Sequence, residues 1–234
     1  FTTTNATYDP TLHVEDCTVD AAYNVVYDSH NTQNFKSVYF GNSIVKMTVA
    51  NKPFYSTKAK DAHTQQLIRL DNNVFYAETP LQNYLINCGD RSQAFQTTRL
   101  QVEVTNNTIY NIYQPNIMIR AYVLAGLTVT KNVGYYTGVT AKSYLTGVYD
   151  TAGFTADKAE VTYNYLYTAP VSDTNFWSAK HTGSYTPANN QMGDGVEAPF
   201  SSMDAAKGYF PVDASVVKTG AGATYDTKAW FKAE

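Results

Sequence analysis

The sequence LDNNVFY at residues 70–76 and the sequence VTNNTIY at residues 104–110 share an Asn-Asn core, apolar residues on both sides and a closing tyrosine. Related seven-residue phrases, VEDCTVD, FGNSIVK, VTKNVGY and VTYNYLY, occur elsewhere in the chain. By subtraction, the steps between successive starts are 26, 30, 34, 25 and 32 residues. This spacing is typical of a repeated coil in which strands keep their length while loops vary. The six copies start at Val14, Phe40, Leu70, Val104, Val129 and Val161.

Each copy shows the alternation of a strand with one buried face. The first residue of every phrase is apolar, and the residue two positions earlier is apolar or small, which is a period of two. We therefore expect both columns to point into one continuous core that stacks from coil to coil. The earlier residues are Leu12, Val38, Ile68, Val102, Leu127 and Ala159.

The fourth position of the phrase is a column of small polar residues that becomes Asn in the later copies. Asn tolerates the left-handed region of backbone conformation, and its amide readily forms hydrogen bonds with neighbouring groups. We expect this column to bend the strand at a tight turn in every coil. The Asn side chains should be buried and hydrogen-bonded along the stack, and therefore structural. The column reads Cys17, Ser43, Asn73, Asn107, Asn132 and Asn164.

Further apolar runs between the phrases predict additional strands in each coil. Examples are YNVVYD at residues 23–28, NYLINC at residues 83–88 and NIMIRA at residues 116–121. Helical periodicity is almost absent. The prediction is an all-β solenoid of about six coils over residues 1–168, in which each strand pairs with the coils before and after it and the open ends need caps.

From residue 169 to residue 234 the repeat stops, and four prolines interrupt the chain. Large aromatic residues are nevertheless frequent there, and they would be poorly soluble unless they were docked against the rest of the protein. We predict an irregular, aromatic-rich C-terminal segment that packs on the side of the solenoid or caps its end. The aromatic residues include Phe176, Trp177, Tyr185, Phe200, Tyr209, Phe210, Trp230 and Phe231.

Composition limits the classes of function. Lys and Arg number 17 against 20 Asp and Glu without clustering, which argues against nucleic acid because phosphate binding needs a concentrated basic face. No apolar run approaches the roughly 20 residues that cross a bilayer. The 20 tyrosines favour β structure and an extracellular protein that meets sugars. Cys17 and Cys88 are interpreted as free thiols, with a single disulfide as the alternative.

The phrases IRLDNNVFY, VEVTNNTIYN and LTVTKN resemble the coils of right-handed parallel β-helix proteins of the pectin-lyase-like superfamily, whose turns carry an asparagine ladder. The resemblance covers roughly residues 12–168. The tail at residues 208–231 is similar to the closing segment of secreted β-helix proteins of unknown function from glycan-degrading gut bacteria. The resemblance implies a protein of the bacterial outer surface or periplasm with a polysaccharide or cell-surface glycan as partner. Because the superfamily includes lyases, hydrolases, esterases, adhesins and members without catalysis, function must be argued from sites.

Polysaccharide lyases of this fold neutralise a uronate carboxylate, usually with Ca²⁺ or basic residues, and abstract the neighbouring proton with an Arg, Lys or similar base. In the outward columns of the repeat, Arg69 beside Asp71 and Glu103 is the one place where a base and acidic ligands converge. The alternative is an ordinary ion pair between neighbouring strands. The two columns read His13, Tyr39, Arg69, Glu103, Thr128, Glu160 and Glu15, Gly41, Asp71, Thr105, Thr130, Thr162.

Few other residues suggest chemistry. Asn189, Asp194 and Glu197 offer oxygens but do not match a Ca²⁺ loop, so their segment is interpreted as a turn. We expect no cofactor, and Ca²⁺ only if the protein is a lyase. The histidines lack metal-ligand spacing and are interpreted as surface or loop residues; they are His13, His30, His63 and His181.

The seventh position of the phrase is a tyrosine in the last four copies. Position six is mostly apolar, so position seven should face outward once the turn has reset the alternation. Exposed rings about 4.8 Å apart would form a platform on which sugar rings stack. The alternative is a mutually stacked column that a loop or the C-terminal segment covers. The four residues are Tyr76, Tyr110, Tyr135 and Tyr167.

The sequence leaves three hypotheses for function. The first is non-catalytic carbohydrate binding or scaffolding in polysaccharide utilisation, through the four tyrosines and with Arg69 as the contact for an acidic sugar. The second is a polysaccharide lyase that acts on uronate-containing glycans through Arg69, Asp71 and Glu103. The third is a structural or adhesive stalk.

Overall fold

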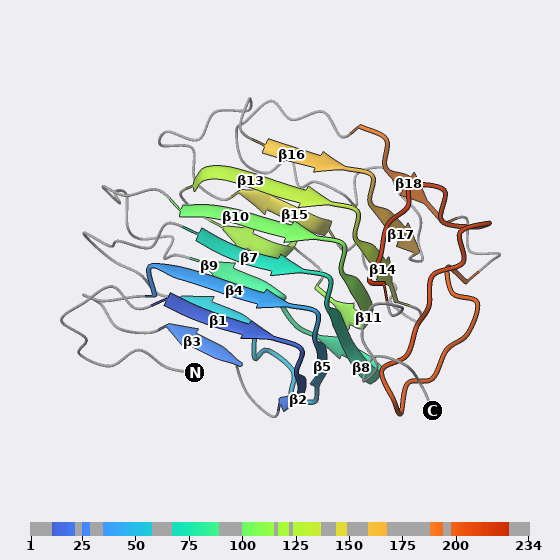
Figure 1. The fold of residues 1–234 in the computed structure, drawn as a ribbon, viewed down its shortest axis with the longest axis horizontal. Coiled ribbons are helices and arrows are strands. Elements are labelled where there is room, and N and C mark those ends of the chain that lie inside the picture. The colour runs from blue at the N-terminus through green and yellow to red at the C-terminus, as the bar shows by residue number, and fades with distance from the viewer. Residues whose placement is uncertain are drawn as a thin grey trace.

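The structure is a computed structural model that describes residues 11–21, 25–28, 35–57, 67–88, 100–114, 117–121, 124–136, 144–148, 159–167, 188–193 and 198–224. The regular elements of these residues are all β-strands, which form three sheets (Figure 1). Every pairing between two of these strands is parallel, as between β1 and β4 or between β8 and β11. The protein is therefore a parallel β-solenoid, as the repeat predicted.

Among the described residues, successive coils place their strands in the three sheets in the same order, so neighbours in a sheet are three elements apart in the chain up to β17. Sheet 1 contains β1 (Thr11–Glu15), β4 (Ser37–Gly41), β7 (Leu67–Asp71), β10 (Leu100–Thr105), β13 (Leu124–Thr130) and β16 (Ala159–Thr162). Sheet 2 contains β2 (Thr18–Ala21), β5 (Ile44–Met47), β8 (Val74–Gln82), β11 (Thr108–Tyr113), β14 (Val133–Tyr135), β17 (Tyr165–Tyr167) and β18 (Gln191–Met192). Sheet 3 contains β3 (Val26–Asp28), β6 (Tyr55–Thr57), β9 (Ile86–Cys88), β12 (Ile117–Ala121) and β15 (Tyr144–Val148).

The inward columns form the core that the alternation predicts. Phe40, Leu70 and Val104 have no exposed surface, and neither have Val129 and Val161. Fully burying a side chain of this kind stabilises the fold by about 1.5–3 kcal/mol, and every coil adds such a layer. The first coil ends the stack, so its phrase residue is only partly buried against the cluster.

The fourth position of the phrase forms the predicted asparagine ladder at the corner between sheets 1 and 2. Asn73, Asn107, Asn132 and Asn164 are fully buried. The backbone N–H and the Nδ2 of Asn107 both donate to Oδ1 of Asn132, at 3.0 Å each. Nδ2 of Asn107 also donates to the carbonyl of Leu70 in the previous coil at 3.0 Å. The stacked amides thus satisfy backbone groups that the corner would otherwise leave buried and unpaired.

The left-handed backbone conformation lies one residue earlier than the sequence predicted, at the third position of the phrase. The third residue turns the chain, and the fourth supplies the amide that satisfies the turn. This division explains why buried Asn recurs at position four while position three tolerates a lysine and a tyrosine. Positive φ angles of 47–58° occur at Asp16, Asn42, Asn72, Asn106, Lys131 and Tyr163.

A seventh ladder turn lies in the segment that the sequence predicted to be irregular. Asn189 has a φ of 57°, and Asn190 takes the ladder position. Oδ1 of Asn190 accepts hydrogen bonds from the N–H and the Nδ2 of Asn164 at 2.9 and 3.0 Å. β18 then continues the register of sheet 2. The sequence PANNQMG lacks the apolar start and the closing tyrosine of the other copies, so the phrase pattern does not identify it.

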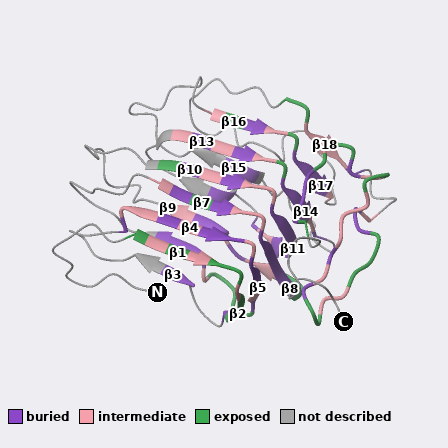
Figure 2. Cartoon of the chain, viewed as in Figure 1, coloured by how far each residue is buried: buried purple, intermediate pink, exposed green. Residues whose placement is uncertain are grey.

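Residues 198–224, which we call the C-terminal strap, run over the outer face of sheet 2 (Figure 1). The strap folds back on itself, with antiparallel bridges between Phe200 and Val212 and between Asp204 and Tyr209. Figure 2 shows the strands of sheet 2 mostly buried, whereas the strands of sheet 1 alternate between buried and accessible residues. A second hydrophobic cluster between sheet and strap contains Ile44, Val74, Tyr76, Val133, Tyr165, Phe200, Phe210, Val217, Ala221 and Ala223.

Candidate functional site

The outer face of sheet 1 carries the two polar columns of the repeat, and no described segment lies in front of it in Figure 1. The strand register places His13, Tyr39, Arg69 and Glu103 side by side on β1, β4, β7 and β10. The neighbouring row consists of Glu15, Gly41, Asp71 and Thr105. The residues that the sequence singled out for chemistry therefore share one flat, rigid surface.

Tyr39 lies along its strand over Gly41. A Cβ on Gly41 would collide with the hydroxyl and the ring of Tyr39, so the ring occupies the space of the missing side chain. The His13 ring packs beside it from β1, with 4.5 Å between the ring centroids and 45° between the ring planes. Tyr39 is half-buried in this position. The sheet thus supports an aromatic ring that is still accessible from outside.

Glu15 holds a carboxylate on one side of Gly41. Its Oε1 accepts a hydrogen bond from Nδ2 of Asn42 at 2.6 Å. Its Oε2 lies 3.4 Å from Nε2 of His13. Because Glu15 pairs with Gly41 in the sheet register, its carboxylate lies beside the ring of Tyr39.

Asp71 holds a second carboxylate on the other side of Gly41, its register partner on β4. Oδ1 of Asp71 accepts hydrogen bonds from Oγ1 of Thr105 at 2.6 Å and from Nδ2 of Asn106 at 3.1 Å. Both donors come from the next coil. The carboxylate is therefore fixed by its neighbours, while Oδ2 takes no part in these two bonds.

Arg69 forms the ion pair that the sequence named as the alternative to a lyase site. Its Nε donates to Oε2 of Glu103 at 2.5 Å. Oε1 of Glu103 accepts from Nε2 of Gln101 at 2.6 Å. The guanidinium side chain is 45% exposed and the Glu103 side chain 16% exposed, so solvent screens the pair only in part.

Burial and neighbouring charges change the acidity of the Tyr39 phenol and of the Arg69 guanidinium. Burial raises the pKa of the Tyr39 phenol above 10.0, Glu15 and Asp71 raise it further, and Arg69 lowers it. The hydrogen bond to Glu103 raises the pKa of Arg69 above its ordinary value. At neutral pH the site therefore presents a protonated phenol and a charged guanidinium.

The predicted tyrosine platform lies on sheet 2 beneath the C-terminal strap. The rings of Tyr110 and Tyr135 stack with centroids 5.2 Å apart and planes 8° apart, and Tyr135 stacks on Tyr167 at 4.9 Å. The strap residue Phe210 stacks on Tyr110 at 4.0 Å. Tyr76, which packs beside the same phenylalanine, is 4% exposed. Tyr110, Tyr135 and Tyr167 are half-buried against the strap. The column is therefore mutually stacked and in part covered, which is closer to the alternative that the sequence left than to an open platform.

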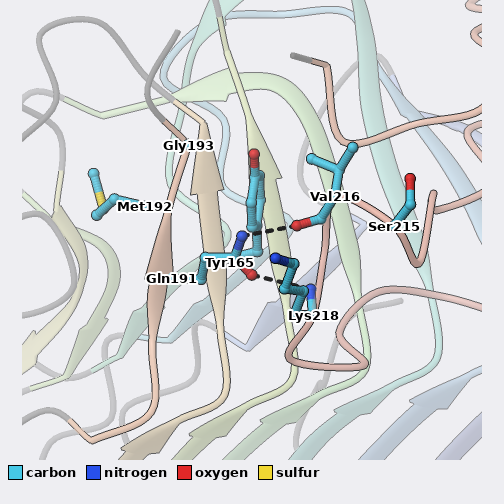
Figure 3. A pocket seen from close by; sticks show the side chains of 7 residues that line it. All are labelled: Tyr165, Gln191, Met192, Gly193, Ser215, Val216 and Lys218. Atoms are coloured by element: carbon cyan, nitrogen blue, oxygen red, sulfur yellow. Dashed lines mark hydrogen bonds between the residues drawn. The ribbon is translucent and has the colours of Figure 1, made fainter. Parts of the chain in front are cut away.

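A pocket of about 200 Å³ lies where the strap meets β18. Nε2 of Gln191 donates to the carbonyl of Val216 at 2.7 Å, and its Oε1 accepts from the N–H of Lys218 at 3.0 Å (Figure 3). The polar groups at this place bind the strap to β18. We therefore interpret the pocket as part of the contact between the strap and this strand. It is lined by Tyr165, Gln191, Met192, Gly193, Ser215, Val216 and Lys218.

Of the remaining sequence candidates, those that the structure describes do not come together as a metal site. Cys17 is a free, half-buried thiol whose Sγ donates to the carbonyl of Glu15 at 3.2 Å. Among the described residues, no group of three or more His, Cys, Asp or Glu side chains is arranged to hold a metal ion. The part of the chain that the structure describes includes no helix of the length and hydrophobicity that crossing a bilayer requires. His30, His63, His181, Asp194, Glu197 and the side chain of Cys88 lie outside the described residues.

In the sequence, Tyr39 stands out only as a member of an outward column. The signal for its role was the pair Tyr39 and Gly41, two residues apart on one face of a strand. A glycine at that spacing leaves room for a ring to lie along the strand, and the acidic residues opposite the glycine add hydrogen-bonding partners. Comparison with models of protein families, with curated proteins and with solved structures finds no match to this chain. Its function is therefore argued from this geometry.

Proposed function

We propose that the protein is a secreted or surface-attached β-helix that binds or scaffolds carbohydrate in polysaccharide utilisation, without catalysis, and that the glycan lies on the outer face of sheet 1. The observation that carries this proposal is the Tyr39 ring, laid over Gly41 between Glu15 and Asp71. A pyranose stacks its C–H face on an aromatic ring, and its hydroxyls donate to carboxylates. Both kinds of partner are present here on a rigid sheet.

The shape of the surface also favours a polymer over a small molecule. Strands of a sheet lie about 4.8 Å apart, so the row that begins at His13 and Tyr39 continues across the sheet at a fixed spacing. An elongated chain lying across this face would contact the ring of Tyr39 at one unit and the polar side chains of neighbouring strands at the next units. We expect longer oligosaccharides to bind better than short ones.

The likeness of the coils and the tail to parallel β-helix proteins of the pectin-lyase-like superfamily, among them secreted proteins of glycan-degrading gut bacteria, supports a polysaccharide or a cell-surface glycan as the partner. A location on the bacterial outer surface or in the periplasm follows from the same likeness. The tyrosine column of sheet 2 has a packing role in this proposal, because the strap lies over it.

The lyase hypothesis has less support from the geometry. A catalytic base must give up its own proton at the working pH, and the ion pair with Glu103 stabilises the protonated form of Arg69. The simple test is incubation with uronate polysaccharides, with and without Ca²⁺. A Ca²⁺-dependent rise in the ultraviolet absorbance of an unsaturated product would establish the lyase instead.

Affinity electrophoresis through gels that contain single polysaccharides tests the binding site. We expect at least one polysaccharide to retard the parent protein and Tyr39→Ala to abolish the retardation. Gly41→Val provides a second test, because the new side chain pushes the tyrosine ring off the sheet while keeping it in the protein.

Tyr163→Asn is the matched control, since it removes an exposed tyrosine at a turn whose φ of 58° suits Asn. It should leave the retardation unchanged. Equal retardation of the parent and of both sheet 1 variants would move the site elsewhere. No retardation of the parent by any polysaccharide would leave the structural or adhesive stalk as the better hypothesis.

A further inference from the structure

We infer that the Tyr39 site selects uncharged glycans and discriminates against chains that carry uronate or sulfate groups. This inference rests on the proposed function, since it names the class of glycan that the same site takes. It departs from the sequence-based expectation that Arg69 contacts an acidic sugar.

The first argument is the sign of the charges around the ring. Among the described residues, the charged groups that act on the Tyr39 phenol are three carboxylates, of Glu15, Asp16 and Asp71, and one guanidinium, of Arg69. A sugar stacked on the ring is surrounded by the same groups. Its hydroxyls can donate to the carboxylates, whereas a carboxylate or sulfate on the sugar meets like charge.

The second argument is the state of Arg69, the one cation in this set. A guanidinium recognises a carboxylate best when its N–H groups are free to bind it in a fork. Here Nε of Arg69 already donates to Glu103, and the charge of that carboxylate offsets the guanidinium charge. The other N–H groups of Arg69 can still donate to a sugar, but the pair with Glu103 has no net charge to set against the carboxylates of Glu15 and Asp71.

The third argument is that the carboxylates are held in place. Asn42 donates to Glu15, and Thr105 donates to Asp71. These bonds keep both carboxylates beside the ring. The negative field therefore belongs to the built surface and does not depend on mobile side chains.

The experiment uses a matched pair of polymers. The neutral polysaccharide that most strongly retards the parent protein is oxidised at C6, which converts primary hydroxyls to carboxylates while the backbone linkages stay the same. Retardation by both polymers is measured at low and high salt for the parent and for the variant Glu15→Gln/Asp71→Asn. The substitutions keep the shape of both side chains and remove both charges.

For the parent at low salt we expect the oxidised polymer to bind roughly tenfold more weakly than the neutral one, because two like charges within a few ångströms of it are only partly screened. The difference in binding between the neutral and the oxidised polymer should become smaller at high salt and in the double variant. Equal or stronger binding of the oxidised polymer by the parent would overturn the inference and leave the proposed function intact. If no neutral or acidic polysaccharide retards the parent, the proposed function fails and this inference fails with it.

Discussion

The outer faces of sheet 1 and sheet 2 are built by the same repeat and both carry aromatic rings, yet the strap covers only sheet 2. On sheet 2, Tyr76 is 4% exposed and the other three tyrosines of the column are half-buried against the strap. Tyr39 on sheet 1 is half-buried over a glycine of its own strand. The difference lies in the column next to the rings. On sheet 2 it reads Thr18, Ile44, Val74, Thr108, Val133 and Tyr165. On sheet 1 it reads Glu15, Gly41, Asp71, Thr105, Thr130 and Thr162.

From Tyr76 onward the two outward columns of sheet 2 consist mostly of apolar and aromatic residues, and a hydrophobic surface of this kind is one that a folded protein covers. A sheet on which one ring is surrounded by polar side chains does not need a cover. The outward column next to the rings therefore decides whether an aromatic ring on a solenoid is used for packing or remains available to a ligand. Substitutions on the two faces should differ accordingly.

Phe210→Ala should cause the largest loss of stability, because it disrupts the packing of the strap on sheet 2. Phe210 is fully buried and contacts Tyr76, Tyr110 and Phe200. Truncating such a residue lowers the free energy of unfolding by about 3–5 kcal/mol. Tyr39→Ala, on the open face, should cost less than about 1 kcal/mol, because surface substitutions disturb little packing. Urea unfolding followed by circular dichroism measures both, and equal losses would contradict the distinction between the faces.

Two glycines of the strap sharpen the same comparison. Gly208 and Gly220 both have a φ of 65°, but a Cβ on Gly208 would lie 2.7 Å from Ile44 and from Tyr76, whereas a Cβ on Gly220 would meet open space. Gly208→Ala should lower the free energy of unfolding by about 2–4 kcal/mol through overpacking and backbone strain. Gly220→Ala should cost about 1 kcal/mol through strain alone. Similar melting temperatures for the two variants would show that the strap is loosely seated at Gly208.

The sequence predicted the solenoid well because its signals are local and repeated. A buried residue such as Leu70 recurs with a period of two along each strand, and a buried amide such as Asn107 recurs once in each coil. The left-handed residue was placed one position late, since Asn occupies both positions in LDNNVFY and VTNNTIY and nothing local tells them apart. The seventh turn at Asn190 was missed because only its ladder contacts mark it.

The candidate site was harder to predict, because it depends on which segment covers which face. The position of the strap is set by contacts such as that of Ala223 with Thr108 across 115 residues, which no local pattern encodes. The ring of Tyr39 likewise depends on the side chain that Gly41 lacks. Both facts agree with the sequence once the outward columns next to the aromatic rings are compared. The alternation alone predicts only which side chains point inward and which point outward.

Asn107→Ala tests the corner that the two faces share. Removing the amide takes away the partner of the buried N–H of Asn73 and a donor to the carbonyl of Leu70, whereas Oδ1 of Asn132 keeps the backbone N–H of residue 107. The free energy of unfolding should therefore fall by about 1–3 kcal/mol. Retardation by a polysaccharide should not change, because the residue is buried away from both outer faces. Lys131→Asn is the control at the exposed third position, and it should leave the stability unchanged or slightly higher. A larger loss for Lys131→Asn than for Asn107→Ala would argue against the ladder as the source of stability.

The smallest expected effect is a difference between the two faces in how the pKa of a tyrosine responds to its surroundings. The pKa of Tyr39 and the pKa of Tyr135 both lie above 10.0, in each case first because of burial. The folded state thus favours the protonated phenol, and the stability that this contributes is present below pH 10.0 and declines as the pH rises beyond it. The second cause differs, since Glu15 and Asp71 act on Tyr39 and only other tyrosines act on Tyr135.

Salt should therefore distinguish the two residues. Between about 0.01 M and about 1 M salt the screening length falls from about 30 Å to about 3 Å, which weakens the carboxylates around the accessible Tyr39 but leaves the effect of burial unchanged. Difference absorbance of the phenolate, taken between the parent and Tyr39→Phe and between the parent and Tyr135→Phe, follows each residue separately. We expect the pKa of Tyr39 to decrease with salt and the pKa of Tyr135 to move less. An equal response would mean that the carboxylates of sheet 1 do not set the field at the ring, and the selection of uncharged glycans would lose its physical basis.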